Sequence, residues 1–571
     1  MKSRTTIALF LSFLLLAVTA CSEQDKGKRA VAKFELFELV PADTPYVVAS
    51  SRPLPRVLSE RMLKAVSMQR EKWEAQLVMM EAEAESTAQK RLSKMLLAVS
   101  QELEGNLSRE GLSSLGFAAH GRSVVYGLGV MPVAWFEIED PDKVSAFLDR
   151  VEMRAGLTSR RGRLGQIDYR RYEMGKISGI AALKGGYLVF ALMPREGEAE
   201  LLPLALGEEK PEHSLAESGA FREFTARHGF LGYNEGYVDW NRILEMVLGE
   251  AGGINARVLQ ILGVELEEVS PGCRRLAKFV VQGVPRLGFG YVAATDDSYT
   301  VEVVVESSPG VGGWLKQVAA PVPGLGSAAG ATFSFGVGLD LPKVRDGLKV
   351  LLGNIAEQGK ECETLDQQEL VQATQSLDLM LNPMLAGVKG FNLVLDEIQV
   401  DPDTLEPKSV AARLLVAATD PRGLFGMAGM LDPKLAMLQI PQDGTPVKLP
   451  LEESLPMAPP AWVAIQGEAL GLFLDAQPPN DGARVLSEPP ASSSLILALD
   501  YDVKKLLQQI GPSLEHTMET MQGEEAEDAR EVYETIKETA SLYDHFSFGI
   551  HGEERGLVMR GKVEFGSGSA K

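Results

Sequence analysis

Short apolar segments recur along the whole chain, and most of them end at a Gly, Pro or Asp. Apolar or alternating segments of about four to eight residues, bounded in this way, predict β-strands. Between them, apolar residues recur every three or four positions, which predicts helices that bury one face. Strands are expected at 46–50, 136–139, 186–192, 237–239, 286–292, 299–305, 333–339, 416–419, 462–465, 470–474, 497–499, 545–551 and 557–563.

Many of these predicted strands follow one another as hairpins, with helical segments between the hairpins. Hairpins favour antiparallel sheets, whereas a parallel sheet would need continuous apolar strands at closer and steadier intervals. The predicted fold class is therefore α+β, with largely antiparallel sheets and helices packed against them.

Five predicted strands end in an aspartate that precedes a helical pattern, namely Asp140, Asp239, Asp340, Asp420 and Asp500. A carboxylate in this position accepts hydrogen bonds from the N–H groups of the first helical turn. Aspartates also serve as catalytic acids and bases, but helix capping explains all five positions with one physical role. We therefore predict five N-caps.

The order of the predicted elements repeats once along the chain. A strand ending at Asp239, a helix near 273–282 and hairpin strands at 286–292 and 299–305 form the first set. A strand ending at Asp500, a helix near 532–542 and hairpin strands at 545–551 and 557–563 repeat it. We predict two related halves, residues 34–315 and 321–571, joined by a Pro- and Gly-rich segment at 321–330.

A long helical pattern near the N-terminus is expected as an insertion in the first half. From about residue 55 to 107 it keeps apolar residues at spacings of three and four, and after Pro55 it contains neither Gly nor Pro before Gly105. Ser86 and Gln89 fit a capping box, which predicts two helices or one bent helix. The apolar face is expected to lie on the sheet. Docking of a partner protein on these helices is the alternative.

The first residues have the composition of a secretory signal. Lys2 and Arg4 are followed by an uncharged, largely apolar run that is too short to cross about 30 Å of hydrocarbon comfortably. The run closes with Val18-Thr19-Ala20-Cys21, which resembles the lipobox of bacterial lipoproteins. The resemblance implies cleavage before Cys21 and diacylation of its thiol. A simple cleaved signal followed by a chance cysteine is the alternative.

Residues 22–33 are polar and resemble the tether of such lipoproteins. At about 3.5 Å per residue this tether reaches roughly 40 Å, which keeps the folded body close to a bilayer. Ser22 stands where inner-membrane lipoproteins often carry Asp, so the resemblance implies the outer membrane, facing the periplasm. The stretches 39–48 and 441–450 also resemble uncharacterised bacterial envelope lipoproteins, which carry no functional residues over to this chain.

With Cys21 lipidated, Cys273 and Cys362 are the remaining cysteines of the chain. An even number of cysteines in an oxidising compartment predicts a disulfide between them. Two separate buried thiols are the alternative. Because neither cysteine lies in a Cys-x-x-Cys motif or near a His, their sequence context does not indicate a metal or redox site.

Composition excludes some partners, and the motifs indicate little chemistry. A formal net charge of −21 without a basic stripe argues against nucleic acid as a partner. The chain has no nucleophile elbow, P-loop or zinc motif, so we predict no catalytic residues, cofactor or metal. His545 and His551 share a strand face, but a metal would need further ligands.

A Met-rich segment at 423–440 is interrupted by glycines. Methionines adapt to irregular apolar shapes, so this segment is either an ordinary core helix or a binding surface. The expected function is that of a membrane-anchored envelope lipoprotein, acting as a non-enzymatic binding or scaffolding component with a possible envelope protein partner. A carrier of lipid or another apolar ligand, and a hydrolase with dispersed catalytic residues, are the alternatives.

Overall fold

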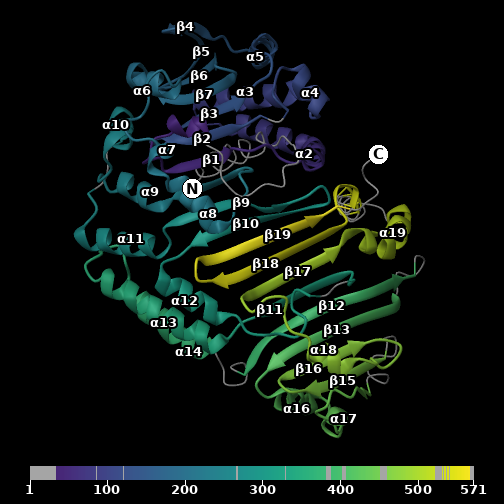
Figure 1. The fold of residues 1–571 in the computed structure, drawn as a ribbon. Coiled ribbons are helices and arrows are strands. Elements are labelled where there is room, and N and C mark those ends of the chain that lie inside the picture. The colour runs from purple at the N-terminus through teal and green to yellow at the C-terminus, as the bar shows by residue number, and fades with distance from the viewer. Residues whose placement is uncertain are drawn as a thin grey trace. The chain divides into compact units, whose positions relative to one another are not determined.

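The computed structural model describes residues 34–565, apart from 85, 120, 265–267, 328–329, 381–386, 402–406, 451–459, 521–529, 531–532, 535–536 and 539. Cys21, the predicted signal and tether, and residues 532, 535–536 and 539 of the helix expected at 532–542 lie outside the described residues. The chain divides into two compact units (Figure 1). The first runs to Val269 and includes Pro285–Val301. The second consists of Ser270–Val284 and the chain from Glu302 onward.

The first unit is built on an antiparallel sheet. Its strands are β1 (Tyr46–Ser50), β2 (Ser123–Leu128), β3 (Met131–Glu137), β4 (Arg160–Leu164), β5 (Ile167–Met174), β6 (Ile177–Lys184), β7 (Tyr187–Pro194), β8 (Glu235–Asp239) and β9 (Arg286–Ala294). Their order in the sheet is β4-β5-β6-β7-β3-β2-β1-β8-β9. Strand β10 (Ser298–Glu306) crosses the boundary between the two units.

Helices flank this sheet. They are η1 (Glu35–Glu38), α2 (Arg56–Ala82), α3 (Thr87–Glu102), α4 (Arg109–Ser114), α5 (Pro141–Ala155), η2 (Arg195–Gly197), α6 (Glu198–Ala205), α7 (Leu215–Ser218), α8 (Ala220–His228), α9 (Trp240–Val247) and α10 (Gly253–Ile261). A core cluster forms where α5 buries Val144, Phe147 and Val151 against Met174 and Leu188 of the sheet.

The strands of the second unit are also antiparallel. Its strands are β11 (Phe333–Gly338), β12 (Val388–Val400), β13 (Pro407–Ala418), β14 (Val447–Lys448), β15 (Ala461–Gln466), β16 (Ala469–Leu474), β17 (Leu495–Asp502), β18 (His545–Glu553) and β19 (Gly556–Glu564). Their order is β19-β18-β17-β11-β12-β13-β16-β15-β14. Its helices are α11 (Pro271–Gly283), α12 (Pro309–Val318), α13 (Leu341–Gln358), α14 (Gln367–Met380), α16 (Pro421–Leu431), α17 (Pro433–Ala436), α18 (Gly482–Leu486) and α19 (Val503–Thr520). The fold class is α+β, as predicted.

The strand orders of the two units correspond position by position. The series β9-β8-β1-β2-β3-β7-β6 in the first matches β18-β17-β11-β12-β13-β16-β15 in the second. A helical pair follows the first strand of each unit, α2 and α3 after β1, and α13 and α14 after β11. A duplication would produce this correspondence, and common descent of the halves stays a prediction. The units differ from the predicted halves because α11, the end of β10 and α12 group with the second unit.

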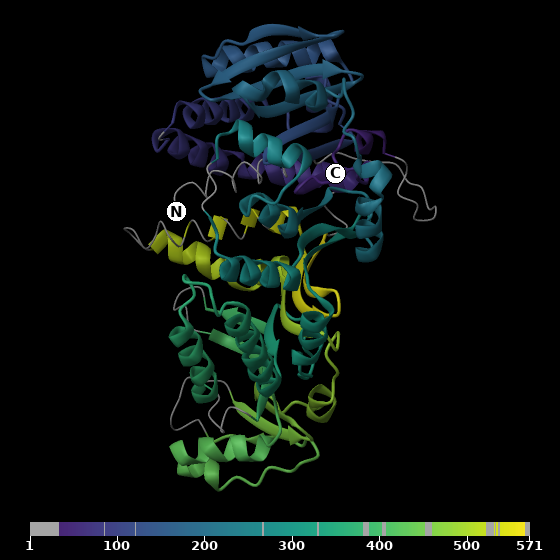
Figure 2. The same ribbon diagram turned by 90° about the vertical axis from the view of Figure 1, so that its left-hand side faces the viewer.

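The predicted helical segment at 55–107 forms two helices, α2 and α3, which run side by side (Figure 2). The Ser86 hydroxyl accepts a hydrogen bond from the backbone N–H of Gln89, and the Gln89 side chain accepts one from the Ser86 N–H. The predicted capping box is therefore confirmed, and it starts α3 after the break that follows α2.

Four of the five predicted aspartate caps are confirmed. Carboxylate oxygens accept hydrogen bonds from first-turn N–H groups at Asp140, Asp239, Asp340 and Asp420. The prediction for Asp500 is wrong, because β17 continues for two residues past it. Asp502 caps α19 by accepting a hydrogen bond of 2.8 Å from the Lys505 N–H, while Asp500 pairs with His545.

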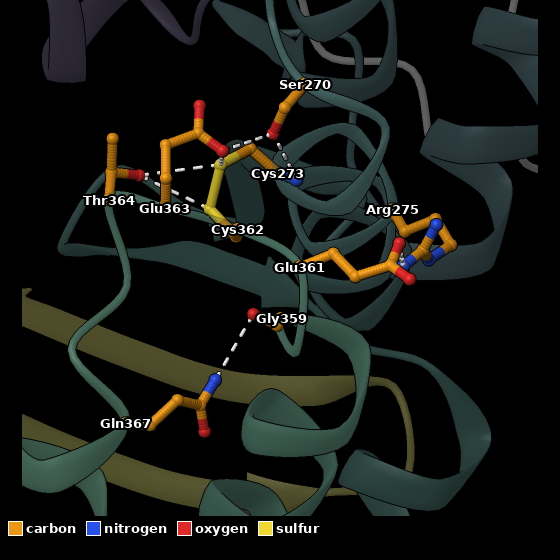
Figure 3. The surroundings of a disulfide bond; sticks show 9 residues. All are labelled: Ser270, Cys273, Arg275, Gly359, Glu361, Cys362, Glu363, Thr364 and Gln367. Atoms are coloured by element: carbon orange, nitrogen blue, oxygen red, sulfur yellow. Dashed lines mark hydrogen bonds and ion pairs between the residues drawn. A yellow bond between two sulfur atoms is a disulfide. The ribbon is translucent and has the colours of Figure 1, made fainter.

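A disulfide joins Cys273 and Cys362 in the second unit, as the sequence predicted (Figure 3). It links the first turn of α11 to the loop between α13 and α14. Ser270 caps α11 and also donates a hydrogen bond of 2.7 Å to the Glu363 carboxylate beside the bridge. The disulfide therefore ties together segments that are 89 residues apart in the sequence.

Candidate apolar binding cavity

A cavity of about 280 Å³ lies in the first unit, between a layer of helices and the sheet. Helices α2, α3 and α5 line one side, and strands β2, β3, β6 and β7 line the other. Its apolar lining includes Leu63, Val66, Leu92, Met95, Leu96, Val99, Leu103, Phe117, Ala134, Phe136, Phe147, Leu148, Val151, Phe190 and Leu192. Most of the wall is therefore made of aliphatic and aromatic side chains.

The two walls of the cavity follow from the helical spacing of apolar residues on α3 and from the two-residue alternation along the strands. On α3, Leu92, Leu96, Val99 and the following Leu103 lie on one helix face because they are three or four residues apart. On the sheet, alternate residues of a strand share a face, and Phe190 of β7 lies opposite Ala134 of β3. Ala134 and Gly179 are small residues, and they leave room that larger side chains would fill.

Several side chains near the centre of this sheet are only partly buried. Phe136, Phe190 and Leu192 belong to interior strands, yet each retains accessible surface. Each of the three also lines the cavity. Incomplete packing of this kind is unusual in a protein interior, where side chains normally fill the space at close to crystal density. These apolar surfaces therefore remain available for a ligand.

Ion pairs hold α3 over the cavity. The Glu102 carboxylate at the end of α3 accepts hydrogen bonds from Arg150 at 2.7 Å and from Arg154 at 2.8 Å, both on α5. Burial favours the protonated acid, but the two arginines outweigh it and keep the pKa of Glu102 below its usual value. At the other end of α3, Arg91 donates to the backbone carbonyl of Glu173 on β5.

Helix α2 is attached mainly to α3. Ser100 donates a hydrogen bond of 2.7 Å to Glu74, and Arg70 donates one of 3.0 Å to Glu104. Leu58, Leu63 and Leu77 are buried, whereas Val78 is 52% exposed. Leu63 and Val66 contribute to the cavity wall, so α2 forms an outer part of the cover.

Arg122 and Glu137 lie at one edge of the cavity. Their side chains point to the sheet face opposite Ser123 and Phe136, because neighbouring residues of a strand face opposite sides. Arg122 Nη2 donates to Glu137 Oε1 at 3.1 Å and to the Tyr187 hydroxyl at 3.0 Å. The same nitrogen lies 3.5 Å from Glu35. The hydrogen bonds with Glu137 raise the pKa of Arg122, and burial raises the pKa of Tyr187 to about 12.

Ser123 lines the cavity next to Arg122 in the sequence. Its side chain is almost completely buried, with 3% of the residue surface exposed. Within the described part of the chain, its Oγ has no hydrogen-bond partner. A buried hydroxyl without a partner is costly, so this atom is a candidate contact for a polar group of a ligand.

The two histidines singled out in the sequence have separate partners. His545 Nε2 lies 2.9 Å from Asp500 Oδ1, and this hydrogen bond raises the pKa of His545. His551 Nδ1 lies 3.2 Å from Ser494 Oγ, and burial lowers the pKa of His551. Among the described residues, no group of three or more metal-ligating side chains is gathered at one place.

The Met-rich segment divides between core and surface. Leu424, Phe425 and Leu438 pack against a core cluster of the second unit. Met430 and Met437 are 84% and 76% exposed. A second hollow, of about 220 Å³, lies beside α16 and is lined by Asp420 as well as by apolar residues. The segment therefore buries one face and presents methionines on another.

The carrier alternative supposed a cavity between sheet and helices, but the sequence did not locate it. The sequence does contain one signal, the three- and four-residue spacing of apolar residues within 55–107, which includes Leu92, Leu96, Val99 and Leu103. It gave no sign that Ser123 or Arg122 would lie at the same place. No helix of the described chain is both long and apolar enough to cross a membrane. No protein-family model matches the chain, and the searches of curated proteins and of solved structures found no match either.

Proposed function

We propose that this protein is a lipid-anchored envelope protein that binds a single-chain apolar ligand in the cavity of its first unit. The observation that carries the proposal is the cavity of about 280 Å³ between the sheet and the helices α2, α3 and α5. The proposal makes the expected role of a non-enzymatic binding component more specific. It also names this cavity as the site that the carrier alternative would use.

The volume sets the size of the ligand. A methylene group occupies about the volume of a water molecule in the liquid, about 30 Å³, so the cavity holds a chain of about nine or ten carbons. Burying each methylene contributes about 0.8 kcal/mol, which gives roughly 7 kcal/mol for such a chain. This free energy corresponds to a dissociation constant on the order of 10 μM.

The hydrolase alternative receives less support at this cavity. A serine nucleophile needs a base within hydrogen-bond reach, but Ser123 Oγ has no hydrogen-bond partner among the described residues. His545 and His551 belong to the second unit. The arrangement of groups around the cavity therefore favours binding of a ligand over its chemical conversion.

The envelope location rests on the sequence around Cys21. A lipobox-like signal and a short polar tether imply that acyl chains hold the protein at a bilayer, where free acyl compounds are available as ligands. Anionic lipid surfaces repel the negatively charged body of the protein. The protein would therefore contact the membrane through the acyl chains on Cys21 and not through its folded units.

The substitution Val99→Phe tests the proposed binding. Val99 lines the cavity from α3, so a phenyl ring at this position fills space that the ligand needs. We expect binding of decan-1-ol, measured by displacement of the neutral dye N-phenyl-1-naphthylamine, to weaken at least tenfold without a lower melting temperature.

Val78→Phe is the matched control because Val78 lies on α2, is largely exposed and does not line the cavity. Its dye and decan-1-ol binding should equal those of the unsubstituted chain. Equal binding by the Val99→Phe and Val78→Phe variants would place the ligand elsewhere and would refute the proposal.

A further inference from the structure

We propose that Glu235 is a pH-sensitive latch on the cover of the cavity. In its neutral form it holds the loop between α8 and β8 against the segment that leads into α2, and ionisation of its carboxyl releases that loop. We define the latch loop as residues 229–235. The inference rests on the proposed function and adds the regulation of ligand exchange at the same cavity.

Glu235 begins β8 and is completely buried inside the first unit. It pairs with Ala49 of β1, so it lies on the sheet face opposite to that of Val48, the residue before Ala49. Val48 packs with Phe136 and Phe190, which line the cavity. Glu235 therefore lies on the far side of the sheet from a ligand and acts on the cavity only through the chain segments that it holds.

The carboxyl of Glu235 holds the latch loop by one of its two oxygens. Oε2 accepts a hydrogen bond of 2.7 Å from the backbone N–H of Gly232, whereas Oε1 is buried and has no partner among the described residues. Ser51 Oγ, which follows Ala49 by two positions on the same face, is likewise buried without a partner in the described chain. An ionised carboxylate in such a place is poorly compensated for the loss of water, and the neutral acid is tolerated more easily.

The latch loop in turn holds the segment that leads into α2. The backbone N–H of Arg52 donates a hydrogen bond of 3.0 Å to the carbonyl of Gly232, and Arg52 Nη1 donates one of 3.3 Å to the carbonyl of Leu231. The two segments pack closely, since a Cβ atom on Gly232 would lie 2.9 Å from Arg52 Cδ. Helix α2 starts shortly after Arg52 and contributes Leu63 and Val66 to the cavity wall.

The groups around Glu235 come from several elements. Arg52 favours the ionised form of Glu235 by its positive charge. His228 of α8 and Tyr237 of β8 belong to the aromatic layer that covers this sheet face. Gly290 of β9 lies against Glu235 and brings no side chain. Burial outweighs Arg52 and raises the pKa of Glu235 to about 7.

The direction of the pH effect follows from the folded and unfolded states. The unfolded-state pKa of Glu235 is near 4.5 and its folded-state pKa is about 7. The latch therefore contributes its full stability below pH 4.5 and loses it as the pH rises through 7. Above that pH the carboxylate regains water when the latch loop opens, which frees Arg52 and loosens the start of α2. We expect slow ligand exchange in acid and faster exchange in mild alkali.

The test measures the release of N-phenyl-1-naphthylamine from residues 22–571, produced without lipid, which contain every described element. Neither the dye nor decan-1-ol changes its charge between about pH 5.5 and about pH 8.5. Mixing the dye complex with excess decan-1-ol in a stopped-flow instrument gives the dissociation rate of the dye. We expect this rate to be at least about fivefold higher at the upper pH, with its midpoint near pH 7.

Variants assign the pH dependence to one residue. Glu235→Gln keeps a polar side chain of similar shape but cannot ionise, so its release rate should stay at the slow value throughout the range. Glu223→Gln is the matched control, because Glu223 lies at an exposed position of α8; it should show the same rise as the unsubstituted chain. A rate that still rises with pH in Glu235→Gln would assign the effect to another group, such as His228, and would overturn the inference.

A measurement without ligand separates the latch from the proposed function. The hydrogen-exchange protection factor of the Arg52 amide, which corrects for the intrinsic effect of pH, should fall at least about fivefold between the same two pH values in the unsubstituted chain. Constant protection of this amide would overturn the latch, whether or not Glu235→Gln folds. If the dye binds at neither pH, the proposed function is overturned, and the Arg52 amide alone decides on the latch.

Discussion

At the scale of single residues, neighbours in the sequence have different roles at the cavity. Arg122 has several hydrogen-bonding partners, whereas the hydroxyl of Ser123 has none in the described chain. A satisfied ion pair contributes mainly to structure, and an unsatisfied buried hydroxyl is a place where a ligand can gain a bond. The Ser123 hydroxyl is therefore the place in the cavity wall where a ligand can gain a hydrogen bond.

Glu102 provides a pH test of how α3 is held. Its folded-state pKa is lowered, because Arg150 and Arg154 outweigh the effect of burial. The stabilisation is therefore present above the unfolded-state pKa, near 4.5, and is lost as the pH falls through the lower folded-state value. We expect Glu102→Gln to lower stability by about 1 kcal/mol at pH 7, measured by urea unfolding.

The difference between the Glu102→Gln variant and the parent chain should shrink as the pH is lowered below 4.5. Glu83→Gln, at an exposed position after α2, is the control and should show little change at either pH. A deficit at Glu102 that does not depend on pH would contradict the ionic attachment of α3 to α5.

Gly272 offers a test of close packing beside the disulfide. A Cβ atom at this position would lie 2.3 Å from the carbonyl carbon and oxygen of Glu361, and 2.7 Å from the Cys362 nitrogen. Because the Cys273–Cys362 bridge restrains both segments, the backbone cannot separate easily. We expect Gly272→Ala to destabilise the protein by about 1–3 kcal/mol in thermal unfolding.

Gly283, at the end of the same helix, has open space where its Cβ would lie. Gly283→Ala should therefore be neutral or slightly stabilising, since alanine restricts the unfolded chain more than glycine does. Similar melting temperatures for the two variants would show that α11 and the loop after α13 do not pack as described.

At the scale of elements, alternation was the most dependable signal in the sequence. The hairpins β9–β10 and β18–β19 were predicted nearly to the residue because apolar and small residues alternate along them. Strands β4 and β5 were missed because arginines interrupt the apolar pattern, as in Arg160, Arg161 and Arg163. These strands are polar on their exposed face, so no continuous apolar run marks them.

The site was less predictable than the fold. The apolar stripe of α3 was visible as a helical period, but a period gives the direction of a face and not the space beneath it. The cavity depends on small residues that lie opposite that stripe, such as Ala134 of β3 and Gly179 of β6. The helical period of α3 says nothing about these strand residues. Asp500 illustrates the same limit, since the two extra residues of β17 moved the helix cap to Asp502.

The disulfide holds the first turn of α11 to the loop between α13 and α14 more tightly than the same contact would be held without it. It closes a loop across 89 residues, which in the chain-entropy view contributes about 4–5 kcal/mol. We expect Cys273→Ser combined with Cys362→Ser to lower the free energy of unfolding by up to this amount. Peptide mapping without reduction should show the two cysteine peptides joined, and free thiols at both positions would contradict the bridge.

At the scale of the whole molecule, the two units share a strand order, yet the large apolar cavity belongs to the first. The helical pair of the second unit, α13 and α14, has its connecting loop fixed to α11 by the disulfide. The pair α2 and α3 is held by ion pairs and hydrogen bonds instead. The proposed binding site therefore belongs to the unit in which, among the described residues, the helical pair is held without a disulfide.

Anchoring is a property of the whole molecule and is tested at Cys21. Cells expressing the chain and supplied with an alkyne-labelled fatty acid should yield labelled protein in the membrane fraction. The substitution Cys21→Ser should abolish the labelling. Equal labelling of the Cys21→Ser variant, or recovery of the unsubstituted chain wholly in the aqueous fraction, would refute the proposed lipid anchor.

The central claim is that an apolar chain lies between α3 and the sheet. Methyl-labelled protein with decan-1-ol, examined for nuclear Overhauser effects between ligand and protein, tests it directly. The account predicts contacts from the decyl chain to the methyl groups of Val66, Met95 and Val99. Contacts confined to exposed methionines such as Met430 and Met437, or no contacts at saturating decan-1-ol, would contradict it.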